Sequence, residues 1–320
     1  MKGTHSITVK NNVLQYKFEI RRNITIIRGD SATGKTTLVD MIREYYENGE
    51  QSGVVLQCDK QCVVLEGRQW KVLLATIQDS IVFIDEGNAF VASREFAEEV
   101  KRSDNYFVIV TRESLATLPY SVEEIYGIKS SGKYGALQQT YQEFYRIYGK
   151  QQYDNLFNPE IILVEDSNSG YEFWEYAMQK KNRTVVSAGG KSNIFGKLGF
   201  YEDKKVLVIA DGAAFGPEMD KVMKKILAGN EKVLYLPESF EWLILKSGVV
   251  KDKDINKILG NPGEYIESEK YMSWEQFFTG LLMEKTKDSY LKYEKKELNV
   301  AYKNDKIAGK IMEAVPKELV

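Results

Sequence analysis

The sequence predicts an α/β protein made of two strand–helix units followed by a helical tail. Its 320 residues are enough for two domains. Short apolar runs alternate with stretches of helical periodicity between residues 24 and 110, and the same alternation returns between residues 161 and 236. Such alternation predicts parallel sheets with helices on both faces. We expect a first domain over residues 1–150, a smaller α/β domain over 151–250 and a helical extension over 251–320.

The first predicted strand, residues 24–27, leads into the segment GDSATGKT, and a helix follows. This segment fits the phosphate-loop pattern G-x-x-x-x-G-K-[ST] at every fixed position. Its glycines let the backbone curl so that several N–H groups point at one phosphate, and the helix N-terminus adds positive potential. Lys35 is expected to reach the β- and γ-phosphates, and Thr36 to bind Mg²⁺. The sequence therefore predicts a site for ATP and Mg²⁺, formed by Gly29, Asp30, Ser31, Ala32, Thr33, Gly34, Lys35, Thr36 and Thr37.

Two later apolar runs end in polar residues that complete such a site. The run at residues 80–84 ends in Asp85 and Glu86. We expect Asp85 to enter the Mg²⁺ shell through water and Glu86 to orient or deprotonate the attacking water. Taken alone, a buried strand that ends in solvated acids is the plainer interpretation. Together with a complete phosphate loop, the pair favours catalysis.

The next apolar run, residues 106–110, ends in Thr111 and Arg112. These patterns resemble P-loop ATPases of the AAA and ABC type, in which a polar residue closing the strand beside the Asp-Glu strand senses the γ-phosphate. The resemblance implies an ATPase with Lys35, Glu86, Thr111 and Arg112 as catalytic residues. Arg112 would act on its own subunit or on a neighbour, or remain a surface charge. The chain lacks a Leu-Ser-Gly-Gly run, so we expect a compact P-loop domain and leave a homo-oligomer open.

Composition and charge narrow the classes of function that the chain can have. The 44 basic and 46 acidic residues give a net charge of −2, so bulk charge predicts no nucleic-acid binding. The two cysteines, Cys58 and Cys62, lack a second pair or nearby histidines, so we expect idle thiols in a reducing cytoplasm rather than a zinc site. The single histidine, His5, lies in what we expect to be a ragged N-terminus, which excludes Ser-His-Asp chemistry. With no signal peptide or long apolar stretch, we expect a cytoplasmic protein that does not contact membranes.

The second unit places acids at the ends of two predicted parallel strands. The strand at 161–164 ends in Glu165, and the strand at 205–210 ends in Asp211. We expect a helix between residues 169 and 179, a strand at 184–187, a helix at 218–227 and a strand at 233–236. Because the carboxyl ends of parallel strands converge on one edge, the two acids are expected to share a Mg²⁺ ion.

This arrangement resembles a TOPRIM domain, the metal-binding module of topoisomerases, bacterial primases and OLD-family nucleases. Glu165 matches the family glutamate, and Asp211 matches the first aspartate of the Asp-x-Asp pattern. The loop at residues 189–191 and the segment at 236–238 also resemble OLD-type sequences, as does the order of an ATPase domain followed by TOPRIM. The second aspartate of the pattern, however, falls on Ala213. Glu165 and Asp211, with Glu238 or Glu241, would hold one ion, and Asp166 or Asp220 would have to supply the ligand for a second.

Three further expectations concern the rest of the chain. The basic residues between 180 and 225 form a candidate rim for a nucleic-acid backbone, although interspersed acids equally suit a solvated surface. The stretch from Leu137 to Tyr148 is expected to be helical. In the tail, Trp274, Phe277, Phe278 and Leu281 give a helical apolar stripe, expected to pack on the second sheet.

Two functions compete on this basis. One is an ATPase that controls a Mg²⁺-dependent nuclease site in DNA repair or phage defence, as the OLD resemblance implies. The other is an ATP-dependent switch whose second domain only binds a ligand. A small-molecule kinase is a weaker alternative, because Asp85 and Glu86 resemble a water-activating pair more than part of an acceptor site.

Overall fold

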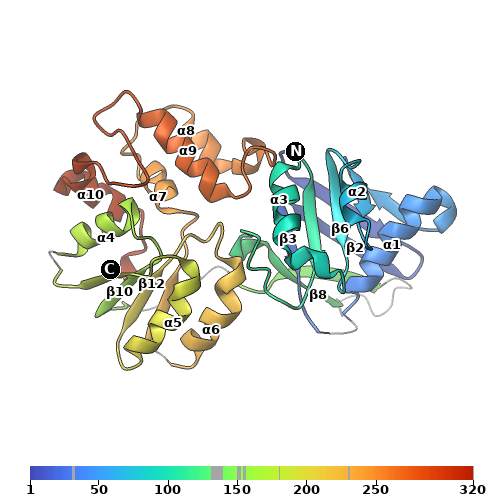
Figure 1. Ribbon diagram of the computed structural model, residues 1–320, viewed down its shortest axis with the longest axis horizontal. Coiled ribbons are helices and arrows are strands. Elements are labelled where there is room, and N and C mark those ends of the chain that lie inside the picture. Colours follow the sequence, from blue (N-terminus) through green and yellow to red (C-terminus); the bar gives the residue numbers. More distant parts are fainter. Residues whose placement is uncertain are drawn as a thin grey trace. The chain divides into compact units, whose positions relative to one another are not determined.

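In the computed structural model the chain is an α/β protein divided into two compact units (Figure 1). The structure describes residues 1–30, 33–130, 140–149, 153, 156–179, 181–229 and 231–319. The first unit comprises Met1–Gly149 and Pro262–Ser273, and the second Lys150–Asn261 and Trp274–Val320. This division differs from the expected one at the C-terminal segment, which is shared between the two units instead of forming a separate extension.

The first unit is built on a nine-stranded sheet in the order β4-β1-β2-β9-β8-β3-β7-β6-β5. Strands β8, β3, β7, β6 and β5 run parallel to one another, while β1 pairs antiparallel with β2 and β4. The sheet is thus mixed, whereas the sequence predicted a wholly parallel sheet. Its strands are β1 His5–Lys10, β2 Leu14–Ile20, β3 Ile24–Ile27, β4 Val55–Gln57, β5 Gln61–Val64, β6 Ser80–Ile84, β7 Tyr106–Val110, β8 Ile125–Ser130 and β9 Thr140–Arg146.

Helices cover both faces of this sheet. Strands β3, β6 and β7 are buried along their whole length, as central strands covered on both sides are. Alternate residues along the strands contribute their side chains to two hydrophobic cores, one on each face of the sheet. One contains helix α1, Lys35–Asn48, and the other contains helices α2, Trp70–Leu74, and α3, Arg94–Arg102. The packing therefore fixes where α1 begins relative to the carboxyl ends of β3, β6 and β7.

The two edge strands of the sheet lie close together. β4 and β5 stand at opposite ends of the strand order, yet only Cys58, Asp59 and Lys60 separate them in the chain. Such a connection spans at most about 14 Å. The sheet therefore curls until its edges approach each other, and α1, which packs against β1, β4 and β5, lies inside the curl.

Two further sequence expectations fail in this unit. His5 is not in a ragged terminus: it is the first residue of β1 and is buried. The predicted helix from Leu137 to Tyr148 is wrong where the structure describes it, because Thr140–Arg146 forms β9, parallel to β2 and antiparallel to β8; residues 137–139 lie outside the described residues. Strand pairing overrides the helical pattern here, and β9 is rich in the aromatic and β-branched residues that favour strands.

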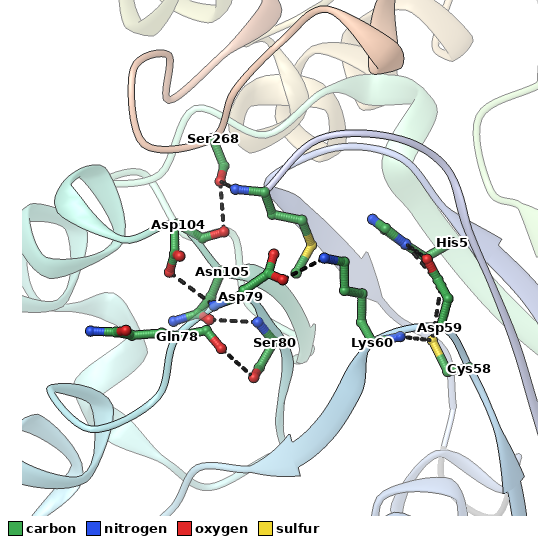
Figure 2. Close-up of polar contacts among 11 residues, drawn as sticks. His5, Cys58, Asp59, Lys60, Gln78, Asp79, Ser80, Asp104, Asn105 and Ser268 are labelled. Carbon is green, nitrogen blue, oxygen red and sulfur yellow. Dashed lines mark hydrogen bonds and ion pairs between the residues drawn. The ribbon is translucent and has the colours of Figure 1, made fainter.

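Residues 262–273 belong to the first unit through specific hydrogen bonds. The Ser268 hydroxyl donates to the Asp104 carbonyl at 2.9 Å and accepts from the Met1 ammonium at 3.1 Å (Figure 2). The buried Asn23 amide donates to the carbonyls of Ser268 and Tyr271. These contacts tie the C-terminal segment to the start of the chain, which no local sequence pattern indicates.

The second unit has a four-stranded, wholly parallel sheet in the order β11-β10-β12-β13. Helix α4 packs against β10 and β11, and α6 packs against β13 (Figure 1). Helix α9, with its stripe of Trp274, Phe277, Phe278 and Leu281 buried, packs against α7. The elements are β10 Ile161–Val164, α4 Ser169–Gln179, β11 Thr184–Ser187, α5 Ile194–Leu198, β12 Val206–Ile209, α6 Met219–Leu227, β13 Lys232–Tyr235, α7 Phe240–Lys246, α8 Ile255–Gly260, α9 Trp274–Thr286 and α10 Asp305–Met312.

Candidate functional site

The loop between β3 and α1 has the backbone geometry that its glycines permit. Gly29 and Gly34 adopt φ angles of 134° and 86°, which side chains other than glycine rarely adopt. Gly34 is also crowded, since a Cβ there would lie 2.8 Å from the hydroxyl of Tyr16, which donates to the Gly34 carbonyl at 2.9 Å. Ser31 and Ala32, predicted parts of the loop, lie outside the described residues. The described part of the loop is thus held from β2 by Tyr16.

Lys35, the first residue of α1, points back at this loop. Its side chain is 5 % exposed, and its ammonium donates to the Gly29 carbonyl at 2.9 Å, the Thr33 hydroxyl at 3.0 Å and the Asp30 carbonyl. Burial lowers the pKa of Lys35, and the guanidinium of Arg112 acts in the same direction. The loop oxygens therefore hold a positive charge where the phosphate-loop pattern calls for one.

The acidic and sensor positions follow neighbouring strands of the same sheet. β7 lies between β3 and β6, so Asp85, Glu86, Thr111 and Arg112 emerge at the edge that carries the loop. Arg112 Nε donates to Glu86 Oε1 at 2.8 Å, with both side chains substantially exposed. The Thr111 hydroxyl accepts the backbone N–H of Glu113 at 3.1 Å. The structure thus groups the four residues beside Lys35, but holds Glu86 in an ion pair.

One observation indicates that Mg²⁺ fits this edge of the sheet. Oδ1 of Asp85 is buried and lacks a hydrogen-bond partner among the described residues. A buried carboxylate oxygen without a partner is costly unless a cation or water satisfies it. Thr36 and Thr37 are exposed on the first turn of α1. Thr36 and Asp85 are therefore the residues that would hold the ion.

Arg28 is a residue of this site that sequence reasoning missed. It follows β3 directly, is 6 % exposed, and donates to the Tyr120 hydroxyl at 2.9 Å. The same nitrogen lies 3.4 Å from the Glu113 carbonyl. Arg28 thereby ties the end of β3 to the segment that follows Thr111. Its only sequence signal is a charged residue next to the phosphate loop, which does not by itself indicate burial.

In the second unit the structure brings Glu165 and Asp211 together, as their strands lead us to expect. β10 and β12 pair so that Val164 lies opposite Ile209. The backbone N–H of Asp211 donates to Glu165 Oε2 at 3.0 Å, and the N–H of Phe240 donates to Asp211 Oδ1 at 3.2 Å. Both acids line a cavity of about 230 Å³. The carboxylates are therefore already engaged by the backbone around them.

The C-terminal segment adds residues to this cavity that the sequence did not indicate. Glu275, from α9, and Lys295 both line it, and Lys295 Nζ lies 2.5 Å from Glu275 Oε1. Glu241 also lines it and is 2 % exposed; its Oε1 accepts from the Tyr293 hydroxyl at 2.8 Å, whereas its Oε2 has no partner among the described residues. We call Glu165, Asp211, Glu241, Glu275 and Lys295 the acidic pocket.

The acidic pocket is electrostatically crowded. Burial, with a contribution from Glu275, raises the pKa of Glu165 to about 7. Burial also raises the pKa of Asp211 well above its ordinary value, and Glu275, Glu165 and Glu241 add to this. Burial opposes the ionisation of Lys295, but Glu275 and Glu241 outweigh it and raise the lysine pKa. The lysine is thus charged, and two of the acids favour the protonated form.

The pocket does not present a cage for a metal ion. Within the described part of the chain, no three His, Cys, Asp or Glu side chains are placed to hold one. Ala213 is buried and offers no ligand. Asp166 is used elsewhere, because its carboxylate accepts the backbone N–H groups of Ser167, Asn168 and Gly170 at the start of α4. The donor set therefore does not fit the metal that the TOPRIM resemblance implies.

The predicted basic rim is largely engaged within the unit. Several of its members bond to carbonyls or carboxylates nearby, and Lys180 lies outside the described residues. These contacts are Arg183 to Pro159, Lys191 to Ala214, Lys197 to Ser187, Lys204 to Glu160, Lys205 to Glu231 and Lys225 to Glu202. Surface ion pairs of this kind are weak, so they reduce the free positive charge of the rim without abolishing it.

In comparisons with known proteins, no family model matches the chain and no curated protein gives a significant match. The P-loop and TOPRIM resemblances therefore rest on the residues and geometry described above. None of the helices in the described ranges combines the length and the apolar character that crossing a bilayer requires.

Proposed function

We propose that the first unit binds ATP with Mg²⁺ and hydrolyses it. The observation that carries this proposal is the meeting of three features at one sheet edge. They are the loop around Lys35, the Oδ1 of Asp85, which has no hydrogen-bond partner in the part of the chain that the structure describes, and the pair of Glu86 with Arg112. A lysine at the start of a helix that follows a glycine-containing loop favours a polyphosphate, and a buried carboxylate oxygen favours a hydrated Mg²⁺. Bound Mg²⁺ would neutralise charge on the transferred phosphoryl group.

Each protein group has a role in this scheme. Lys35 leaves its loop carbonyls for the β- and γ-phosphates, and Thr36 binds the ion. Glu86 accepts the proton of the attacking water once its ion pair with Arg112 opens. Arg112, released from Glu86, then faces the γ-phosphate from its own subunit or from a neighbouring one.

The test is ATP binding and phosphate release by the purified full chain. Lys35→Met should abolish binding, while Glu86→Gln should keep binding and lower turnover about 10²-fold or more, the usual cost of losing a general base. Lys101→Met, an exposed lysine on α3, is the matched control and should change neither. Binding that survives in Lys35→Met would refute the proposed site. A phosphorylated acceptor in place of free phosphate would identify a kinase.

We further propose that the second unit is a TOPRIM-like domain that binds a ligand without metal-dependent cleavage. ATP would then act as a switch for this unit. The pair of Lys295 with Glu275, together with Ala213, favours this function over the nuclease that the OLD resemblance implies. An ammonium among the acids repels a second cation.

Plasmid nicking distinguishes the two functions. The unmodified chain should not nick DNA with Mg²⁺ or Mn²⁺, and DNA should not stimulate its ATP turnover. Nicking that disappears in Glu165→Ala would establish the nuclease instead. Nicking that persists in that variant would indicate a contaminating enzyme.

A further inference from the structure

The two cysteines of the chain lie together at the turn where the edges of the first sheet approach each other. Cys58 follows β4, and Cys62 is the second residue of β5. Both sulfurs contact the backbone of Lys60: Cys58 Sγ accepts its N–H at 3.4 Å, and Cys62 Sγ donates to its carbonyl at 3.9 Å. The sequence has only these two cysteines. Two sulfurs that bond the same backbone residue across a short turn lie near one another, which a disulfide requires.

The two thiols differ in their surroundings. Cys58 is half-buried, and its sulfur accepts the backbone N–H of Lys60 at 3.4 Å (Figure 2). Cys62 is 3 % exposed and packs in the core that contains α1. Solvent therefore reaches Cys58 but hardly reaches Cys62.

The charges around Cys58 act in both directions. The interaction with Cys62 lowers the pKa of Cys58, and the hydrogen bond from the Lys60 N–H acts in the same direction. Burial and the adjacent Asp59 carboxylate raise it. The net effect is a lowered pKa for Cys58. Asp59 is in turn hydrogen-bonded to His5 Nδ1 at 2.8 Å, and the contacts of its carboxyl outweigh burial and lower its pKa (Figure 2). The Cys58 thiol donates to the same carboxylate at 3.6 Å. The neighbouring Cys58 thiol, together with burial, raises the pKa of Cys62 well above its ordinary value. This asymmetry divides the pair into a nucleophile and a resolving thiol.

We propose that Cys58 and Cys62 are a reversible oxidation site that reacts with peroxides. The Cys58 thiolate attacks one peroxide oxygen, the O–O bond breaks, and hydroxide leaves to become water. The resulting sulfenic acid is attacked by the sulfur of Cys62, the S–O bond breaks, and the S–S bond forms. The departing hydroxide takes the Cys62 proton. Two thiols are oxidised by two electrons, and one hydrogen peroxide is reduced to two waters.

The disulfide would link the two edges of the curled sheet. β4 pairs with β1 and β5 pairs with β6, so the bond joins one edge strand to the other around α1. This oxidation site does not depend on the proposed ATPase activity and is testable without it.

The test is titration of the reduced full chain with hydrogen peroxide, followed by alkylation of free thiols and intact-mass analysis. We expect both thiols to disappear, the mass to fall by about 2 Da, and dithiothreitol to restore it. The product should run as a monomer on a non-reducing gel. Covalent dimers, sulfinic acid at Cys58 without a disulfide, or thiols that survive peroxide sufficient to oxidise glutathione would each overturn the proposal.

Two variants assign the roles. Cys62→Ser should stop at a sulfenic acid on Cys58 that dimedone traps. Cys58→Ser should oxidise at least about tenfold more slowly than the unmodified chain, because Cys62 is buried and its thiolate is disfavoured. Equal oxidation rates in Cys58→Ser and the unmodified chain would refute the assignment. Should Cys62→Ser unfold, alkylation of the unmodified chain gives an independent test: Cys58 must react first, and the reverse order would refute the assignment.

Discussion

Glu165 offers the sharpest test of how the acidic pocket is built. Glu165 is half-buried directly after β10, and its carboxylate accepts the N–H of Asp211. Burial raises its pKa from 4.5 to about 7. The substitution Glu165→Gln keeps an oxygen for the Asp211 N–H while removing the ionisable proton, so it isolates the cost of charging this group inside the fold.

The sign and the magnitude follow from proton linkage. The folded protein binds the Glu165 proton more tightly than the unfolded chain, so stability is highest below pH 4.5 and falls as the pH rises through about 7. At roughly 1.4 kcal/mol per pKa unit, the loss reaches about 3 kcal/mol. Glu165→Gln should therefore be more stable than the unmodified chain at pH 8, by up to this amount. Asp211, whose pKa is also raised, contributes in the same direction and keeps a residual slope in both proteins.

The assay is urea unfolding between pH 5 and pH 8, followed by tryptophan fluorescence with a chelator present. The second unit contains Trp174, Trp242 and Trp274, against Trp70 in the first, so the signal reports mainly on the second unit. Glu284→Gln, at an exposed position on α9, is the control and should leave the pH profile unchanged.

An unchanged pH profile in Glu165→Gln, or a loss of stability at pH 8, would refute this reasoning. Either result would mean that the fold does not raise the pKa of Glu165. Repeating the series with Mn²⁺ then identifies the cause, because a metal that binds the folded state stabilises it by an amount that rises with the logarithm of its concentration. Stabilisation of the unmodified chain but not of Glu165→Gln would assign a metal to the pocket.

Three further substitutions test contacts at the two sites. Gly34→Ala should destabilise the first unit by about 1–3 kcal/mol, since it forces a side chain into a left-handed conformation and against the Tyr16 hydroxyl; circular-dichroism melts measure this. Tyr16→Phe alone should cost about 1 kcal/mol and should reduce the cost of Gly34→Ala in the double variant; strictly additive losses would contradict the contact. Tyr293→Phe should destabilise the second unit by about 1–3 kcal/mol by leaving Glu241 without its hydroxyl donor, and a neutral effect in urea unfolding would show that water replaces it.

The central strands could be predicted from the sequence because a strand that is buried on both faces is a nearly continuous run of apolar residues. β3, β6 and β7 are buried runs made almost wholly of apolar residues, and each ends where a polar or charged residue follows. The same rule located β10 and β12 and the acids after them. Strand adjacency then followed from parallel topology.

The half-buried strands gave a weaker signal and were missed or misread. β1 and β2 alternate between buried and more exposed residues, and the two asparagines between them mark the turn, so a search for alternation would have found this hairpin. The same search would also have predicted that the His5 side chain is buried. β9 is a different case, because its glutamines and tyrosines suit a helix or a strand, and only pairing with β2 and β8 decides between them.

Lys295 and Glu275 could not be assigned to the acidic pocket from the sequence. They lie in the C-terminal segment, more than 60 residues after Asp211, and no local pattern links them to the strand ends. Their placement depends on the packing of α9 against α7, which is a tertiary event. Long-range contacts of this kind leave no periodicity to read.

Lys295 and Ala213 both bear on whether the acidic pocket can bind a metal ion. Relative to the Asp-x-Asp pattern, the chain lacks a carboxylate at position 213, and the ammonium of Lys295 lies beside Glu275 in the acidic pocket. Each difference disfavours a divalent cation, because the cation needs carboxylate ligands and is repelled by an ammonium. Reversing either one alone leaves the other obstacle to metal binding in place. Restoring both, with Ala213→Asp and Lys295→Met, should therefore create Mn²⁺ binding that neither single variant shows, and equal binding by a single variant would break the argument.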